Sequence, residues 1–345
     1  MDELGQLAES AGAVITDRVI QRGRHPTSYY LGRGKLDELR QAINSSGYTV
    51  AIFDDELSPI QQRNLEAALE IKVIDRSALI LDTFAQRART SEGQLQVELA
   101  QHQYLLPRLA GQWTHLERLG GGIGTRGPGE TQLETDRRII RRRIRHLQGQ
   151  LDTVRKQRAL QRQRHVRNQV PIVSLVGYTS AGKSTLFNRI LKDGVVLAED
   201  RVFSTLDPIT RAVFLPSGFR VLLTDTVGFI QKLPPILVAA FRATLEELDQ
   251  ASLLLHVVDI SHRNASEQSQ VVEDTLKNLN LSSRPRILVL NKADLFTGDS
   301  AGELDSFLDN LSIDKTKTAI ISANTGFGIH DLLGKIEYQL QNSLG

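Results

Sequence analysis

A glycine-rich stretch at residues 177–184 constrains the fold of this 345-residue chain more than any other feature. It contains Gly-Tyr-Thr-Ser-Ala-Gly-Lys-Ser and fits the pattern G-x-x-x-x-G-K-[S/T], between an apolar run at 172–176 and a helical pattern at 186–191. Glycines let the backbone wrap closely, so that its N–H groups and the next helix N-terminus face a polyphosphate. We therefore predict a strand, a phosphate-binding loop and a helix. Lys183 would reach the β- and γ-phosphates, and the Ser184 hydroxyl would bind Mg²⁺.

Length and composition exclude several classes of protein. The length predicts two or three domains, and the 40% hydrophobic fraction is enough for ordinary cores. No apolar run approaches the roughly 18 residues of a membrane span, and the N-terminus has no secretory signal pattern. The absence of cysteine excludes disulfides and thiolate metal sites. We expect a cytoplasmic protein without a membrane span.

Residues 1–90 alternate short apolar runs with helical patterns. We predict strands at 50–53 and 71–74 and helices at 35–43 and 59–69. Ser58 is the predicted N-cap of the second helix, because Pro59 follows it. This order favours a small parallel α/β domain. The acidic residues 54–56 at a strand end favour a solvated loop over a metal site.

Residues 91–168 carry two heptad-like seams. The seam positions are Leu95, Leu99, His102, Leu106, Leu109, Trp113 and Leu116, then Leu133, Ile140, Ile144, Leu147, Leu151 and Val154. Between them, residues 120–129 hold six glycines. We predict a long antiparallel helical hairpin with a glycine-rich tip. Pro107 should kink or interrupt its first helix, and packing is the expected role of His102.

The same segment concentrates positive charge. Residues 91–170 hold 15 Lys and Arg against seven Asp and Glu, a net of +8, whereas the rest of the chain has a net of −6. The basic residues of the second helix are Arg137, Arg138, Arg141, Arg142, Arg143, Arg145, Arg155, Lys156, Arg158, Arg162, Arg164 and Arg167. Arginine pairs with phosphate bidentately and stacks on unpaired bases, so we favour nucleic-acid contact over a plain solvated face. A membrane surface is the other polyanion, but the apolar seams are used in hairpin packing.

Residues 169–345 have the element order of a doubly wound nucleotide-binding domain. We predict its strands at 171–176, 211–215, 219–224, 252–259, 285–290 and 317–321. The fold class is therefore α/β. A small N-terminal parallel α/β domain (1–90) and the hairpin (91–168) precede a P-loop domain (169–345).

Three further motifs follow the phosphate loop. In Asp225-x-x-Gly228, the carboxylate can hold Mg²⁺ through water and the glycine N–H can meet a γ-phosphate. In Asn291-Lys-Ala-Asp294, the aspartate can accept from both guanine N1–H and the exocyclic amine, whereas adenine presents an acceptor there. Asn291 would brace this loop. Residues 322–324, Ser-Ala-Asn, would contact the base edge through their backbone.

The interval between the phosphate loop and the Asp-x-x-Gly motif must supply a mobile threonine that closes on Mg²⁺ and the γ-phosphate. Within residues 203–211 we choose Thr205, with Thr210 as the alternative.

Phe229 follows the Asp-x-x-Gly motif, where several GTPases have a glutamine that orients the attacking water. A phenyl ring cannot do this. We predict slow intrinsic hydrolysis, with a partner or a rearranged switch supplying the missing group.

Together these motifs predict a GTPase, with Mg²⁺ as cofactor and GTP and GDP as substrate and product. The predicted catalytic residues are Lys183, Thr205 and Gly228, and the predicted metal ligands are Ser184 and Thr205. The predicted nucleotide-binding residues are Gly177, Tyr178, Thr179, Ser180, Ala181, Gly182, Lys183, Ser184, Phe203, Ser204, Thr205, Leu206, Asp207, Asp225, Thr226, Val227, Gly228, Asn291, Lys292, Ala293, Asp294, Ser322, Ala323 and Asn324.

Four stretches besides the phosphate loop carry a resemblance to a known family. They are residues 120–126, Gly-Glu-Thr-Gln-Leu-Glu-Thr-Asp-Arg-Arg at 129–138, Phe-Ser-Thr-Leu-Asp-Pro at 203–208, and Asp-Thr-Val-Gly-Phe at 225–229. On these residues the chain resembles an HflX-type GTPase over nearly its whole length. The glycine-rich block joined to Glu-Thr-Gln-Leu-Glu is the most specific part.

The resemblance implies a translation-associated GTPase that binds the large ribosomal subunit and, in bacteria, separates stalled or idle ribosomes. It implies that the hairpin and its tip reach ribosomal RNA near the peptidyl-transferase centre. Many relatives have Asn where this chain has Ser180. In related GTPases the resemblance implies that this Asn takes part in potassium-assisted hydrolysis. We therefore do not extend potassium dependence to this chain. We expect a monomer. A non-ribosomal RNA-binding or remodelling GTPase and a membrane-associated regulatory GTPase remain alternatives.

Overall fold

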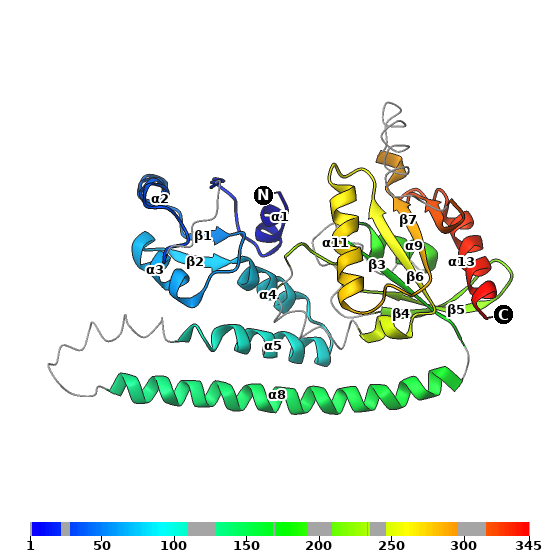
Figure 1. The fold of residues 1–345 in the computed structure, drawn as a ribbon, viewed down its shortest axis with the longest axis horizontal. Helices are drawn as coiled ribbons and strands as arrows, with labels where there is room; N and C mark the ends of the chain where they lie inside the picture. Colours follow the sequence, from blue (N-terminus) through cyan, green and yellow to red (C-terminus); the bar gives the residue numbers. More distant parts are fainter. Residues whose placement is uncertain are drawn as a thin grey trace. The chain divides into compact units, whose positions relative to one another are not determined.

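The computed structural model describes residues 2–21, 28–109, 128–167, 170–191, 209–232, 234, 246–295 and 315–344. Figure 1 shows its helices and strands. The chain divides into two compact units, and the division falls within a long helix, between Val154 and Arg155. The first unit contains a two-stranded sheet and the second a six-stranded sheet.

The first unit begins with a small α/β layer. Its elements are α1 (Asp2–Ser10), α2 (Arg33–Ser46), β1 (Val50–Phe53), α3 (Pro59–Leu69), β2 (Lys72–Asp75) and α4 (Arg76–Arg87). β1 and β2 pair in parallel, which confirms the predicted parallel layer with its second strand shifted by one residue. The Ser58 hydroxyl accepts from the Gln61 N–H (3.2 Å), and the Gln61 side chain accepts from the Ser58 N–H (3.0 Å). This capping box confirms the predicted start of α3.

Two of the acidic residues after β1, Asp54 and Asp55, contact other side chains of the protein. Asp54 accepts a hydrogen bond from the Arg76 guanidinium (2.6 Å), and Asp55 accepts one from the Tyr30 hydroxyl. No group of three or more His, Cys, Asp or Glu side chains suited to a metal ion occurs among the described residues. Asp54 and Asp55 thus hydrogen-bond within the protein, in contrast to the predicted solvated loop, whereas Glu56 is exposed.

Two helices form the predicted hairpin. α5 (Ser91–Leu105) and α8 (Pro128–Arg167) run antiparallel (Figure 1). Their contact is an apolar cluster that consists of Leu95, Leu99, Ile144, Leu147 and Leu151. α5 ends two residues before Pro107, because proline cannot continue the helix. Trp113, Leu116 and residues 120–127 of the predicted tip lie outside the described residues.

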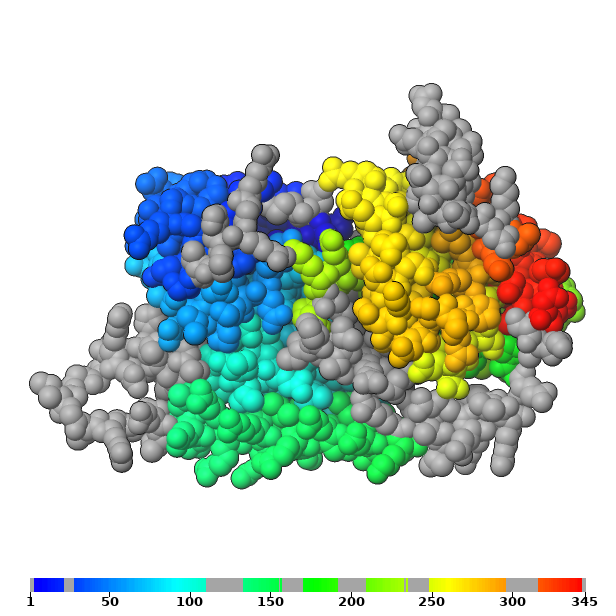
Figure 2. Space-filling model, in the orientation of Figure 1, coloured from blue at the N-terminus to red at the C-terminus, as the bar shows by residue number. Residues whose placement is uncertain are grey.

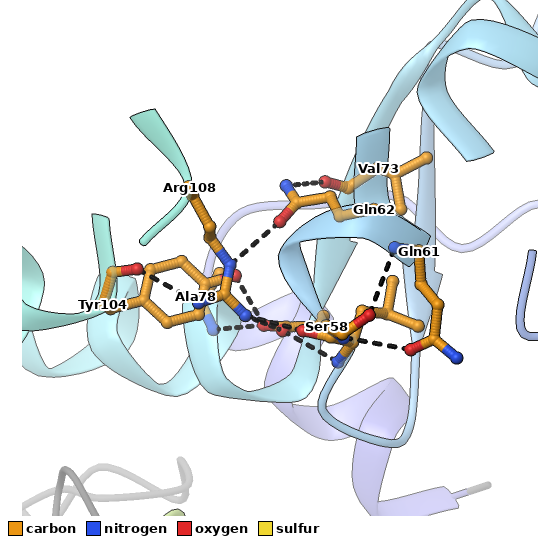
Figure 3. A network of polar contacts seen from close by, with 9 residues as sticks. Ser58, Gln61, Gln62, Val73, Ala78, Tyr104 and Arg108 are labelled. Atoms are coloured by element: carbon orange, nitrogen blue, oxygen red, sulfur yellow. Dashed lines mark hydrogen bonds and ion pairs between the residues drawn. The ribbon is translucent and has the colours of Figure 1, made fainter. Parts of the chain in front are cut away.

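A network of polar contacts joins the end of α5 to the α/β layer, and Figure 3 labels Tyr104, Arg108 and Ala78 within it. Asp75 Oδ1 accepts from the Ala78 N–H (2.8 Å) and the Tyr104 hydroxyl (2.9 Å). Its Oδ2 accepts from the Leu57 N–H (3.1 Å) and from Arg108 Nη2 (3.2 Å). The Arg108 guanidinium also lies 3.6 Å from the Tyr104 ring centroid. Because these donors satisfy a fully buried charge, the turn after α5 is held against the β2–α4 junction.

The second unit is the predicted doubly wound domain. Its elements are β3 (Ile172–Gly177), α9 (Lys183–Leu191), β4 (Ile209–Phe214), β5 (Arg220–Asp225), η1 (Glu246–Gln250), β6 (Leu253–Asp259), α11 (Ala265–Asn278), β7 (Arg286–Asn291), η2 (Ala293–Leu295), η4 (Lys315–Lys317), β8 (Thr318–Ile320) and α13 (Ile329–Leu344). The sheet order is β4-β5-β3-β6-β7-β8. All pairings are parallel except β4 with β5, so the five parallel strands end at one edge.

Helices cover both faces of this sheet. Leu186 of α9 and Leu332 of α13 belong to one buried cluster with Leu175 and Leu255 of the sheet. α11 packs on the other face, where its Glu273 lies 3.3 Å from His256 of β6. In the part of the chain that the structure describes, no helix is long and apolar enough to cross a bilayer. Figure 2 shows the surface in the same orientation.

Replacing Asp75 with alanine should destabilise the first unit by roughly 3–5 kcal/mol, because the Arg108 side chain, which is only 10% exposed, would lose its buried carboxylate partner. Urea unfolding followed by circular dichroism measures this. The matched control is Asp82→Ala: Asp82 is exposed on α4 and contacts the Gln86 side chain (2.9 Å), so its loss should cost less than about 0.5 kcal/mol. Equal effects of the two substitutions would contradict the structural role of Asp75.

Candidate functional site

The phosphate loop passes two positions that only glycine can occupy. Gly177 has a φ of 155°, and a Cβ there would lie 2.3 Å from the Val257 carbonyl oxygen of β6. Gly182 has a φ of 91°, and a Cβ there would lie 2.2 Å from Nδ2 of Asn291 at the end of β7. The loop backbone therefore approaches the neighbouring strands more closely than a side chain allows.

Lys183 begins α9 and directs its side chain back over the loop. Its ammonium donates to the carbonyls of Gly177 (3.1 Å) and Tyr178 (2.7 Å). Burial lowers the pKa of Lys183 to about 8, against an opposing effect of Asp225. A Cβ at Gly228 would lie 3.0 Å from this ammonium. The predicted phosphate lysine and the glycine of the Asp-x-x-Gly motif thus lie side by side.

Ser184 and Asp225 form a pair of oxygen donors. The Ser184 hydroxyl donates to Oδ2 of Asp225 at 2.7 Å, and Asp225 is buried. A hydroxyl and a carboxylate are hard ligands of the kind that Mg²⁺ prefers, so the donor set fits the predicted ion. Thr205 lies outside the described residues, as do the other residues of 203–207. The alternative, Thr210, belongs to β4.

The segment after Asp225 is paired with the phosphate loop through the backbone. The Phe229 N–H donates to the Gly177 carbonyl (3.0 Å), and the Thr179 N–H donates to the Phe229 carbonyl (2.8 Å). The Tyr178 hydroxyl accepts from the Gln231 N–H (2.9 Å). Phe229 is 3% exposed. Its side chain is therefore buried.

Asn291 connects the phosphate loop to the predicted base loop. Its Nδ2 donates to the Ala181 carbonyl (2.8 Å), and its Oδ1 accepts from the Ala323 N–H (3.0 Å). Asn291 is 1% exposed, so both hydrogen bonds are shielded from water. These two hydrogen bonds are contacts of the kind that the predicted bracing role of Asn291 requires.

Asp294 lies at the surface in η2, where it can meet a base. The Ser322 hydroxyl is the main cause that lowers the pKa of Asp294, and the Asn324 side chain and Lys292 act in the same direction. The carboxylate is therefore an ionised acceptor at neutral pH. The sequence motifs 291–294 and 322–324 thus meet in space.

Two contacts at this site were missed by sequence reasoning. Lys292 Nζ lies 2.8 Å from Oδ2 of Asp259, which ends β6. An acid after a buried strand beside β7 could have signalled this contact. Arg189 of α9 donates to the carbonyls of Ala323 (3.0 Å) and Asn324. No sequence pattern marks Arg189.

One arginine of the row on α8 pairs with α5. Arg143 makes a bidentate contact with Glu98 of α5, with Nε–Oε1 at 2.6 Å and Nη2–Oε2 at 2.9 Å. This contact lowers the pKa of Glu98. Among the described side chains of α8, Arg138, Arg141, Arg142 and Arg145 are exposed as well. Arg143 thus adds an ion pair between α5 and α8 at the surface.

Three family models match the chain. Residues 1–85 match "GTP-binding GTPase N-terminal", residues 87–165 match "GTP-binding GTPase Middle Region", and residues 172–292 match "50S ribosome-binding GTPase".

Relatives and solved structures agree with these matches. The chain is 49% identical over 343 residues to the GTPase HflX of Lacrimispora saccharolytica, covering 99% of this chain and 79% of the relative. It is 47% identical over 348 residues to the GTPase HflX of Escherichia coli, covering 100% and 80%. The crystal structure of a GTP-binding protein from the archaeon Sulfolobus solfataricus in complex with GDP is similar at a TM-score of 0.53 and 26% identity. That alignment covers 100% of this chain and 96% of the archaeal one.

The pKa of Lys183 predicts a pH dependence of nucleotide affinity. Below pH 8 the lysine is already protonated, whereas above it the binding of a diphosphate must take up a proton. The Kd for GDP should therefore be nearly constant from pH 7 to 8 and then rise, approaching tenfold for each pH unit. Calorimetry in buffers of different ionisation enthalpy would measure the proton uptake. In Lys183→Met, binding should be weak and the uptake absent; a flat Kd to pH 9 in the unaltered protein would contradict the assignment.

Proposed function

The chain belongs to the HflX family of GTPases, and we propose that it hydrolyses GTP at the carboxyl edge of its six-stranded sheet while bound to the large ribosomal subunit. The observation that carries the proposal is that the Asn291 side chain donates to the Ala181 carbonyl and accepts from the Ala323 N–H, which joins the phosphate loop to the loop at 322–324. The description of the model matching residues 172–292 as a 50S ribosome-binding GTPase supports the choice of partner.

The phosphates of GTP would lie over residues 177–184. Lys183 would exchange the loop carbonyls for the β- and γ-phosphate oxygens, and α9 would present its N-terminus to them. Ser184 and Asp225 would hold Mg²⁺, the latter through water, and Thr205 would close on the same ion. The ion would neutralise charge on the phosphates during transfer. Gly228, which lies beside Lys183, would offer its N–H to the γ-phosphate.

The base would lie between the Asn291–Asp294 and 322–324 loops. The Asp294 carboxylate would accept from the guanine N1–H and the exocyclic amine. Ser322 and Asn324 lower the pKa of Asp294, so the carboxylate would meet the base in its ionised form. Adenine would leave the carboxylate without a donor, so the site would select GTP over ATP.

Hydrolysis would be slow in the isolated protein. Phe229 has neither the chemistry nor the exposure to orient water, and its backbone is paired with the phosphate loop. A group supplied by the partner, or a rearranged switch, would have to position the attacking water. We infer that ribosome binding provides this, which couples hydrolysis to the arrival of the protein at its partner.

The hairpin would provide the contact with ribosomal RNA. The exposed arginines Arg138, Arg141, Arg142 and Arg145 can pair with backbone phosphates, and the glycine-rich tip at 120–129 would let the backbone approach RNA closely. In this scheme segments 1–90, 91–168 and 169–345 act as three domains of a cytoplasmic monomer that separates stalled or idle ribosomes.

GTP turnover with and without purified large subunits, at matched salt, tests the proposed function directly. We expect stimulation of about tenfold or more, because the partner would supply the missing water-positioning group. No stimulation and no nucleotide-dependent co-sedimentation would refute ribosome association. Tighter binding to isolated RNA would then favour a remodelling GTPase, and co-sedimentation with anionic vesicles a membrane-associated one.

Charge reversal on α8 tests the RNA-contacting surface. The triple change Arg138→Glu, Arg142→Glu and Arg145→Glu should weaken large-subunit binding at least tenfold and reduce the slope of log K against log salt by about two to three. The matched control is Arg33→Glu, Arg40→Glu and Arg63→Glu, an equal change in charge at exposed positions of α2 and α3. Equal effects of the two triple variants would show that net charge, and not the α8 surface, determines binding.

A further inference from the structure

Arg189 occupies a junction between the two halves of the nucleotide site. It lies on α9, the helix that begins with Lys183 and Ser184. Its Nε donates to the Ala323 carbonyl at 3.0 Å, and its Nη2 donates to the Asn324 carbonyl. The planar guanidinium thus reaches two consecutive carbonyls of one loop at once, which a lysine ammonium is less suited to do.

The loop that Arg189 holds also orients the residue that would read the base. The Ala323 N–H donates to Asn291, and Ser322 and Asn324 lie close enough to Asp294 to lower the pKa of its carboxyl group. The loop is therefore held by two residues: Asn291 accepts from the Ala323 N–H, and Arg189 donates to the Ala323 and Asn324 carbonyls. Loss of either fastening would let Asn324 and Asp294 move relative to the base.

α9 connects the phosphate loop to the base loop, because it carries both Lys183 and Arg189. Arg189 lies six residues after Lys183, roughly 9 Å along the helix. Leu186 and Phe187 of α9 pack into the core of the sheet, so α9 fixes the positions of Lys183 and Arg189 relative to each other. α9 would therefore both present its N-terminus to the phosphates and position the loop at residues 322–324.

We propose that Arg189 is a positioning residue for guanine recognition, which acts through the Ala323 and Asn324 carbonyls and does not touch the nucleotide phosphates. The inference rests on the proposed function, because it assumes that 322–324 and Asp294 meet the base. Arg189 and Asn324 are exposed, so water can replace the guanidinium at the Asn324 carbonyl, whereas Ala323 is buried. The fold should survive the substitution while the base loop loses its placement.

The experiment compares Arg189→Ala and Arg189→Lys with the unaltered protein. Calorimetry measures the Kd for GDP and, separately, for inorganic pyrophosphate, which has no base. We expect Arg189→Ala to raise the Kd for GDP about tenfold and leave the Kd for pyrophosphate within about twofold. Arg189→Lys should give an intermediate Kd for GDP. The matched control is Arg220→Ala, which removes an exposed arginine of β5 and should change neither constant.

Two outcomes would overturn the inference. An unchanged Kd for GDP in Arg189→Ala would show that the carbonyl contacts do not influence base binding. An equal loss for GDP and pyrophosphate would show that Arg189 acts on α9 and the phosphate loop. Asp294→Asn separates this inference from the proposed function, since it should shift preference from GDP towards xanthosine diphosphate. An unchanged preference there would refute base reading by Asp294, whatever Arg189→Ala does.

Discussion

The buried amide of Asn291 is the interaction on which the nucleotide site depends. One side chain at the end of β7 donates to the phosphate loop and accepts from the base loop. Its closeness to Gly182 also explains why the loop must have glycine at that point. The two loops come from parts of the chain more than 100 residues apart. A hydrogen-bonded amide at 1% exposure fixes their separation, and with it the length of ligand that fits.

The local sequence pattern predicted most of the helices and strands and their order, but not α1 or α4. The apolar runs at 172–176 and 285–290 became β3 and β7 because buried parallel strands need little else to be recognised. Ser58 before Pro59 predicted the start of α3, and the heptad positions Leu99, Leu147 and Leu151 predicted the packing of α5 on α8. Each of these signals operates over a few residues or a fixed helical period, which a sequence displays directly.

Contacts between distant polar residues could not be predicted in this way. Asp75, Tyr104 and Arg108 meet although 33 residues separate the first from the last, and Arg189 meets Asn324 across 135 residues. Nothing in the local sequence distinguishes such arginines from solvated ones. Arg143 illustrates the difficulty, because it stands within an apparently uniform basic row and yet pairs with Glu98. Only tertiary packing decides which charge is structural and which is free to meet a partner.

The bridge between Tyr178 and Phe229 limits how far the Asp-x-x-Gly segment can travel. Ser174 pairs with Thr224, and Tyr178 pairs with Phe229, so four steps along one strand oppose five along the other. The stretch between Thr224 and Phe229, which contains Gly228, therefore has one residue more than the opposite strand, as in a β-bulge. A displacement of Gly228 larger than a peptide rotation would have to break the hydrogen bonds of Phe229 with Gly177 and Thr179. Any such movement of the Asp-x-x-Gly segment would therefore disturb the phosphate loop as well.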